Sequence, residues 1–149
     1  MSDIFLSTVL TLDASVRVCV PLIFASMAGL FAERSGVVDI GLEGKLLMSA
    51  FIAASAAVVF GSPWIGLLAG IIASSVLAMV HGFASITYKG NQIVSGVAIN
   101  ILAAGLTMIL SLAWFKKAGI TPTLNNDQRF LSIDLPGLDL IDHVPILGV

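Results

Sequence analysis

The chain has 149 residues, of which 58% are hydrophobic and 11% are charged, and its formal net charge is −2. Soluble domains carry about 25% charged residues, so this composition excludes an ordinary water-soluble domain. The negative charge balance disfavours nucleic-acid binding, which needs clustered Lys and Arg. The single cysteine, Cys19, excludes an intramolecular disulfide.

Charged residues are absent from three stretches of the sequence, 18–32, 46–88 and 90–115. A membrane-spanning helix needs about 20 apolar residues, because the hydrocarbon core is about 30 Å thick and a helix rises about 1.5 Å per residue. The second stretch is too long for one span and suits two, with Gly, Ser and Pro in its middle favouring a turn. The sequence therefore predicts an all-α, polytopic transmembrane helix bundle. Its predicted spans are residues 14–32, 42–60, 64–87 and 92–115.

The predicted transmembrane region covers residues 1–117, and residues 4–12 are apolar enough to extend its first helix. Residues 118–149 hold no apolar run long enough to span, so we expect an extramembrane loop there. Within this loop, residues 131–141 alternate apolar and polar side chains around a Pro-Gly pair, which favours a hairpin or an extended strip. Apolar character returns at the end of the chain, so we expect the sequence to be a fragment of a longer protein.

Small and polar residues follow one face of each of the last two predicted spans. In lipid, helices associate through close packing of small residues and through hydrogen bonds, so these faces are predicted to meet other helices. On the third span the face comprises Gly66, Gly70, Ser74, Ala78, His81 and Ser85. On the fourth span it comprises Gln92, Gly96, Asn100, Ala103, Thr107 and Ser111.

Asn100 and His81 are the strongest polar groups on these faces. A buried amide costs several kcal/mol in hydrocarbon unless it is hydrogen-bonded, so Asn100 must face a helix, water or a solute. We favour an interhelical hydrogen bond over contact with solute. For His81 we favour packing over a role as ligand or proton carrier. No Cys, Asp or Glu lies at metal-ligand spacing from His81, so we expect no metal.

Residues 33–44, ERSGVVDIGLEG, place charges between two apolar spans. In a continuous helix Asp39 and Glu43 would lie one turn apart and repel each other. The glycines of this segment, Gly36, Gly41 and Gly44, each lower helix propensity by about 0.8–1 kcal/mol relative to Ala. An interrupted or re-entrant segment is therefore one prediction. In transporters such broken helices bind solute. The other is an ordinary solvated loop, and composition alone does not separate the two.

The sequence shows no glycine-rich phosphate loop that ends in Lys-Ser or Lys-Thr. No Ser-His-Asp arrangement is indicated either. We therefore expect no enzymatic activity of its own and no cofactor.

Two segments, PLIFASMAGLFAERSGVVDIGLEGKLLMSAFIAA (21–54) and NQIVSGVAINILAAGLT (91–107), resemble signatures of one permease family. Its members are the inner-membrane subunits of ATP-binding-cassette importers for nucleosides, simple sugars and branched-chain amino acids. The segments are most similar to the nucleoside and sugar types. The family more often has Asn in place of Asp39, and an acidic residue in place of Asn91. Asp39 occurs in sugar permeases, which leaves the solute class open.

The resemblance implies a permease that dimerises with itself or a related subunit in the cell inner membrane or plasma membrane, with its N-terminus outside. Separate ATPase subunits would bind ATP, and an extracytoplasmic binding protein would deliver a nucleoside or simple sugar for alternating-access transport. Family members are longer and carry their ATPase-coupling helix in a second half. The hypothesis for the path lining is Asp39, Glu43, Asn100 and Thr107. An ion-coupled secondary carrier and a non-transporting scaffold subunit are the alternatives.

Overall fold

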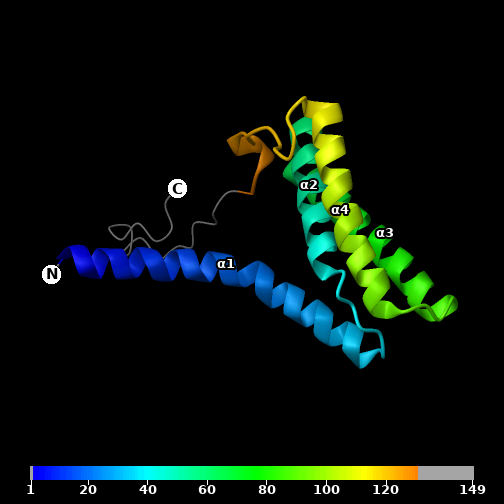
Figure 1. The fold of residues 1–149 in the computed structure, drawn as a ribbon. Helices are drawn as coiled ribbons and strands as arrows, with labels where there is room; N and C mark the ends of the chain where they lie inside the picture. Colours follow the sequence, from blue (N-terminus) through cyan, green and yellow to red (C-terminus); the bar gives the residue numbers. More distant parts are fainter. Residues whose placement is uncertain (1, 131–149) are drawn as a thin grey trace. The chain divides into compact units, whose positions relative to one another are not determined.

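The computed structural model of the protein describes residues 2–130 (Figure 1). Its helices are α1 (Ser2–Arg34), α2 (Leu42–Phe60), α3 (Pro63–Gly82), the π-helix η1 (Phe83–Thr87), α4 (Gln92–Phe115) and the 3₁₀ turn η2 (Asn126–Gln128). Four helical stretches are long and apolar enough to cross a membrane, and residues 2–130 contain no strand. The predicted all-α fold is therefore confirmed. The strip predicted at 131–141 lies outside the described residues.

The chain divides into two units, whose described parts are residues 2–27 and residues 28–130. In the first unit, the described part of α1 exposes most of its apolar side chains, as suits a helix in lipid. Its hydroxyl groups donate to carbonyls three or four residues earlier, which satisfies them within the helix. These donors are Ser7, Thr8, Thr11, Ser15 and Ser26.

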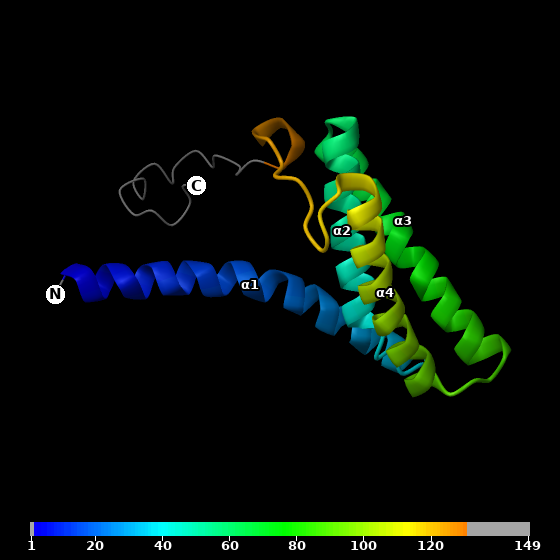
Figure 2. The same cartoon turned by 45° about the horizontal axis from the view of Figure 1, so that its top comes forward.

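In the second unit, α2 packs against both α3 and α4, and Figures 1 and 2 show the three helices side by side. α2 and α4 have the bounds expected from the sequence, and the third predicted span corresponds to α3 followed by η1. The first predicted span is the C-terminal part of the longer α1. The division of the chain into a membrane region and an extramembrane loop stays a prediction.

α2 and α3 approach closely through glycines on α3. A Cβ atom on Gly66 would lie 2.7 Å from the carbonyl oxygen of Ala53 and 2.9 Å from Cβ of Ala57. A Cβ atom on Gly70 would lie 3.0 Å from Cβ of Ala53. The absence of side chains at these glycines is what lets the helices meet at backbone distance.

The core of the second unit is small and draws on all three helices. It consists of Met48, Leu77, Ile99 and Ala103. On α3, Leu77 is buried and its neighbour Ala78 is exposed. The sequence pattern had instead predicted Ala78 on the packing face. The buried face of α3 runs through Gly70, Leu77 and His81, whose spacings of seven and four residues keep them on one side of a 3.6-residue helix.

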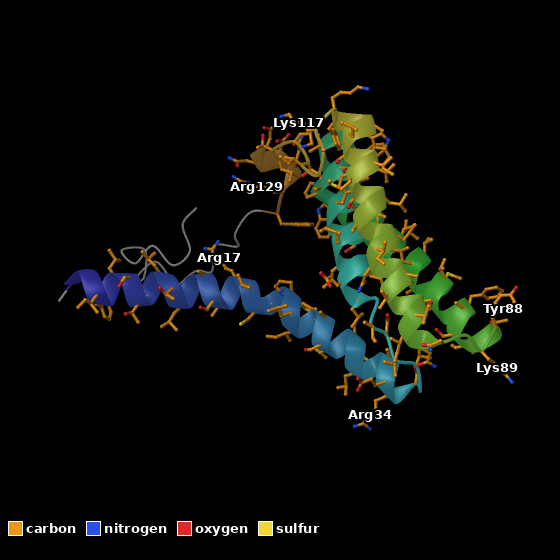
Figure 3. All side chains as sticks on the ribbon, viewed as in Figure 1. Arg17, Arg34, Tyr88, Lys89, Lys117 and Arg129 are labelled. Atoms are coloured by element: carbon orange, nitrogen blue, oxygen red, sulfur yellow. The ribbon has the colours of Figure 1, made fainter. Side chains whose placement is uncertain are left out.

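Basic side chains mark both ends of this three-helix unit. In Figure 3, Arg34 and Lys89 lie at one end, and Lys117 and Arg129 lie at the other. After α4 the chain turns back, because the backbone N–H of Gly119 donates to Oγ of the fully buried Ser111 at 2.7 Å.

Candidate functional site

The α1–α2 loop, residues 35–41, connects the first two long helices through non-helical backbone. It begins where Gly36 adopts φ +83°, a conformation that residues with a Cβ rarely adopt. The N–H of Val37 then donates to the carbonyl of Ala32 at 3.1 Å, and the N–H of Gly36 donates to that of Glu33 at 3.0 Å. This pair of bonds is a Schellman motif, which ends α1 and turns the chain toward α2.

Beyond Gly36 the loop bonds to side chains of distant helices. The N–H of Val38 donates to Oε1 of Gln92 on α4 at 2.7 Å. The carbonyl of Val38 accepts from Nε2 of His81 on α3 at 3.3 Å, and Nδ1 of His81 is hydrogen-bonded with Oγ of Ser95 at 3.1 Å. Non-helical backbone within a membrane bundle needs such partners, because lipid offers none.

Asn100 binds both the loop and the first turn of α2. Its Nδ2 donates to the carbonyl of Ile40 at 3.1 Å, and its Oδ1 accepts from the N–H of Gly44 at 2.8 Å. These are the hydrogen bonds to another helical segment that the sequence analysis favoured for this amide. Contact between Asn100 and solute stays a prediction.

Two glycines let the start of α2 reach the backbone of α4. A Cβ atom on Gly44 would lie 2.8 Å from Cα of Asn100, and one on Gly96 would lie 2.9 Å from the backbone nitrogen of Gly41. Cβ atoms do not fit at such distances without a backbone shift. Gly41 itself has an ordinary backbone conformation, with φ −76° and ψ 7°.

Asp39 of the loop and Lys45 of α2 form a buried ion pair. Nζ of Lys45 donates to Oδ2 of Asp39, and the two side chains are only 8% and 11% exposed. Oδ1 of Asp39 accepts from the N–H of Gly41 at 3.0 Å and lies 3.8 Å from Nε2 of His81. Pairing is what makes charges tolerable among apolar helices.

Glu43 differs from Asp39 in its surroundings. It lies in the first turn of α2, where a carboxylate interacts favourably with the helix dipole. Its side chain is exposed, and within residues 2–130 it makes no hydrogen bond or ion pair. Unlike the carboxylate of Asp39, that of Glu43 therefore remains available to a further partner.

The remaining residues singled out from the sequence lie in different places. Thr107 is buried about two turns along α4 from Asn100, and its Oγ1 donates to the carbonyl of Ala104 at 3.0 Å. The structure therefore does not bring it to the loop. Gly66 and Gly70 lie at the α2–α3 contact, as does the half-buried Ser74, whose Oγ donates to Ile71 of its own helix.

Sequence reasoning missed the partners across the bundle, Gln92 and Ser95 on α4 and Lys45 on α2. Gln92 carried a signal, since it shares a helix face with Gly96 and Asn100. For Lys45 the signal in the sequence was weaker, namely a charge opposite to that of Asp39 six residues further along the chain. Within the described residues, no group of three or more His, Cys, Asp and Glu side chains is placed to hold a metal ion. The site thus stabilises the non-helical α1–α2 loop and leaves the carboxylate of Glu43 exposed beside it.

The chain matches one known protein family and is similar to several known proteins. Residues 11–134 match the family described as "Branched-chain amino acid transport system / permease component". A guanosine ABC transporter permease protein of Bacillus subtilis is 37% identical over 141 residues, which cover 91% of this chain and 42% of the relative.

Two further relatives show the same pattern. A nucleoside ABC transporter permease protein of Lactococcus lactis subsp. cremoris is 31% identical, over 86% of this chain and 40% of its own length. A putative glucose ABC transporter permease protein of Haloferax volcanii is 36% identical, over 72% of this chain and 32% of its own length. The chain thus spans less than half the length of these relatives. No solved structure gives a significant match.

Proposed function

The chain belongs to the family of branched-chain amino acid transport system permease components, and from this we propose that it forms part of the permease subunit of an ATP-binding-cassette importer. The match over residues 11–134 carries the proposal, because it includes all of α2, α3 and α4 together with the α1–α2 loop. Four helices of spanning length support a multi-pass membrane protein, and we place it in the cell inner membrane or plasma membrane.

We propose a nucleoside or a simple sugar as the solute. The relatives named for guanosine, nucleosides and glucose support this class. Such solutes carry several hydroxyl or ring N–H donors, for which a carboxylate is a strong acceptor. Glu43 has the free carboxylate that this recognition requires.

Transport would proceed by alternating access, in which the interior opens outward, takes the solute and then opens inward. An extracytoplasmic binding protein would deliver the solute, a second permease subunit would complete the path, and ATPase subunits would bind and hydrolyse ATP. On this proposal the chain itself needs no cofactor. The α1–α2 loop suits a path lining, because it brings non-helical backbone into the bundle.

Among the four hypothesised path residues, the geometry supports Glu43 best. The polar side-chain atoms of Asp39 and Asn100 are bonded within the bundle, and Thr107 is bonded to its own helix. These three would meet solute only in a state in which those bonds open. Glu43 needs no such rearrangement.

Uptake of a radiolabelled nucleoside or sugar by cells that carry the complete transporter tests this function. We expect Glu43→Gln to lower uptake by about tenfold or more, because a hydrogen bond to a charged group contributes about 1.5–3 kcal/mol. Glu33→Gln is the matched control, since Glu33 is also exposed but lies in the last turn of α1. Equal uptake by both variants would remove Glu43 from the path.

The buried group of Asp39, Lys45 and His81 favours one alternative function, an ion-coupled carrier, since such intramembrane groups can carry protons. Uptake that survives inactivation of the ATPase but stops with a protonophore would assign the chain to that class. Transport that continues after the subunit is deleted would instead indicate a scaffold. Co-purification of an ATPase and a binding protein with the chain would support the importer.

A further inference from the structure

Three side chains replace helical hydrogen bonds at the start of α2. In a continuous helix each N–H would bond to the carbonyl four residues earlier. Here the loop and the first turn of α2 bond instead to Gln92, His81 and Asn100. Of these three side chains, Asn100 bonds to backbone on both sides of Glu43. It donates to the carbonyl of Ile40, three residues before Glu43, and accepts from the N–H of Gly44, the next residue.

We propose that Asn100 is a positioning residue for transport, which acts through the α1–α2 loop and the first turn of α2 to place the carboxylate of Glu43. Its Nδ2 and Oδ1 both bond to backbone at 3.1 Å and 2.8 Å. Both polar atoms of its amide therefore have protein partners in the loop and in α2. The effect on transport rests on the proposed function, whereas the effect on the loop does not.

The substitution Asn100→Asp keeps the hydrogen bond with Gly44 but removes the one with Ile40. The shape of the side chain is kept, and one oxygen can still accept from the N–H of Gly44. The other position changes from a donor to an acceptor, which faces the carbonyl oxygen of Ile40 and repels it. Protonation of the new carboxyl group restores a donor. The defect of this variant should therefore be reversed by acid.

Other titratable or charged groups lie near this position, and the parent protein shares them. They are Asp39 on the loop, Glu43 and Lys45 on α2, and His81 on α3; α4 itself carries no charged residue. The ratio of variant to parent at each pH removes their common effect. Acid recovery of that ratio is a result that a general loss of stability would not give.

The experiment uses the complete transporter in membranes, with Cys19→Ser to remove the native thiol and Ile40→Cys as reporter. Ile40 is 42% exposed, so a small methanethiosulfonate reagent can reach a thiol there. At neutral pH, Asn100→Asp should raise the labelling rate by about tenfold, as expected when the hydrogen bond to the carbonyl of Ile40 is lost. Uptake should fall in parallel, and both ratios should return toward 1 as the pH is lowered.

Asn91→Asp is the matched control. It makes the same chemical change on the same helix, but Asn91 caps α4 through Ile93 and Val94 and does not bond to the loop. Its labelling rate and uptake should equal those of the parent. Loss of uptake by Asn100→Asp with an unchanged labelling rate would overturn the proposal, because Asn100 would then act elsewhere, for example on solute. A defect that acid does not reverse would overturn it too.

A second variant covers failure of Asn100→Asp to reach the membrane. Asn100→Ala removes both bonds, to Ile40 and to Gly44, without adding a charge, and Ile40→Cys again reports on the loop. A rate equal to that of its parent would overturn the positioning account. The parent protein could also take up no nucleoside or sugar while Asn100→Asp still raises the labelling rate. The proposed transport function would then be wrong, whereas the role of Asn100 in positioning the loop would stand.

Discussion

Asp39 and Lys45 form a buried ion pair, and within residues 2–130 no second Lys, Arg, Asp or Glu is paired with either of them. Replacing Asp39 by Asn leaves a buried ammonium group without its counter-charge, a change that typically costs about 3–5 kcal/mol. We expect Asp39→Asn and Lys45→Met to lower the melting temperature of the detergent-solubilised transporter strongly. The double variant should recover most of the loss.

The control for this pair is Glu43→Gln, which removes a charge from the same segment at an exposed position. Exposed substitutions usually change stability by no more than about 0.5 kcal/mol, so the melting temperature should stay near that of the parent. Additive losses in the Asp39→Asn/Lys45→Met variant would show that the two charges do not stabilise each other.

Gly96 offers a second test at a single position. An added Cβ would lie 2.9 Å from the backbone nitrogen of Gly41, and backbone cannot rotate away as a side chain can. We expect Gly96→Ala to destabilise the transporter by about 1–3 kcal/mol, the usual cost of overpacking. Gly105→Ala, on the same helix with nothing within 4 Å of its Cβ, should be tolerated. Similar melting temperatures for the two variants would contradict the close approach.

Sequence patterns located these residues better than they located their partners. The need for a hydrogen bond at Asn100 follows from an amide in an apolar span, and the structure supplies one. That the partners are Ile40 and Gly44 does not follow, since they lie 60 and 56 residues away in the sequence. Periodicity defines which face of a helix is polar, but not the register in which two distant helices meet.

Among the helices, α4 has the clearest start signal. Oδ1 of Asn91 accepts from the N–H groups of Ile93 and Val94 at 3.0 Å and 3.2 Å. Asn91→Ala should weaken the first turn by about 1 kcal/mol, the typical value of an N-cap. Hydrogen exchange by mass spectrometry should then show faster exchange in the peptide that contains Ile93. Asn91→Asp keeps the acceptor and should exchange as the parent does; a fast rate there would contradict the cap.

The helix bounds were predictable where composition changes sharply. α2 and α4 are flanked by glycine, proline or charge, and α2 ends at Gly61, whose φ is +66°. The change from α3 to the π-helix η1 was not predictable, because residues 83–87 are as apolar as the helix before them. Ala78 was predicted on the packing face of α3 because it is small, but it is exposed. Small size allows a residue to pack against another helix, whereas its angular position around the helix axis determines whether it faces that helix.

For the complete chain, orientation in the membrane is the testable property. Lys89 and Lys117 lie at opposite ends of the three-helix unit, joined by α4 (Figure 3). With the N-terminus outside, as the family resemblance implies, a membrane-impermeant maleimide should label Lys117→Cys in intact cells. Lys89→Cys should react only after permeabilisation. Labelling of both from one side would contradict a span at α4, and the reverse pattern would invert the orientation.

The glycine contacts between α2 and α4 also restrict how this part of a transporter can move. Where two backbones touch, no layer of side chains is available to change rotamer and let the helices slide. A shift of α4 by one turn, about 5.4 Å, would bring Gln92 or Asn100 into the place of Gly96, where even a methyl group does not fit. We therefore expect α2, α3 and α4 to move as a single rigid body during transport. The hinges that open the path to either side of the membrane must then lie where this unit meets the rest of the protein.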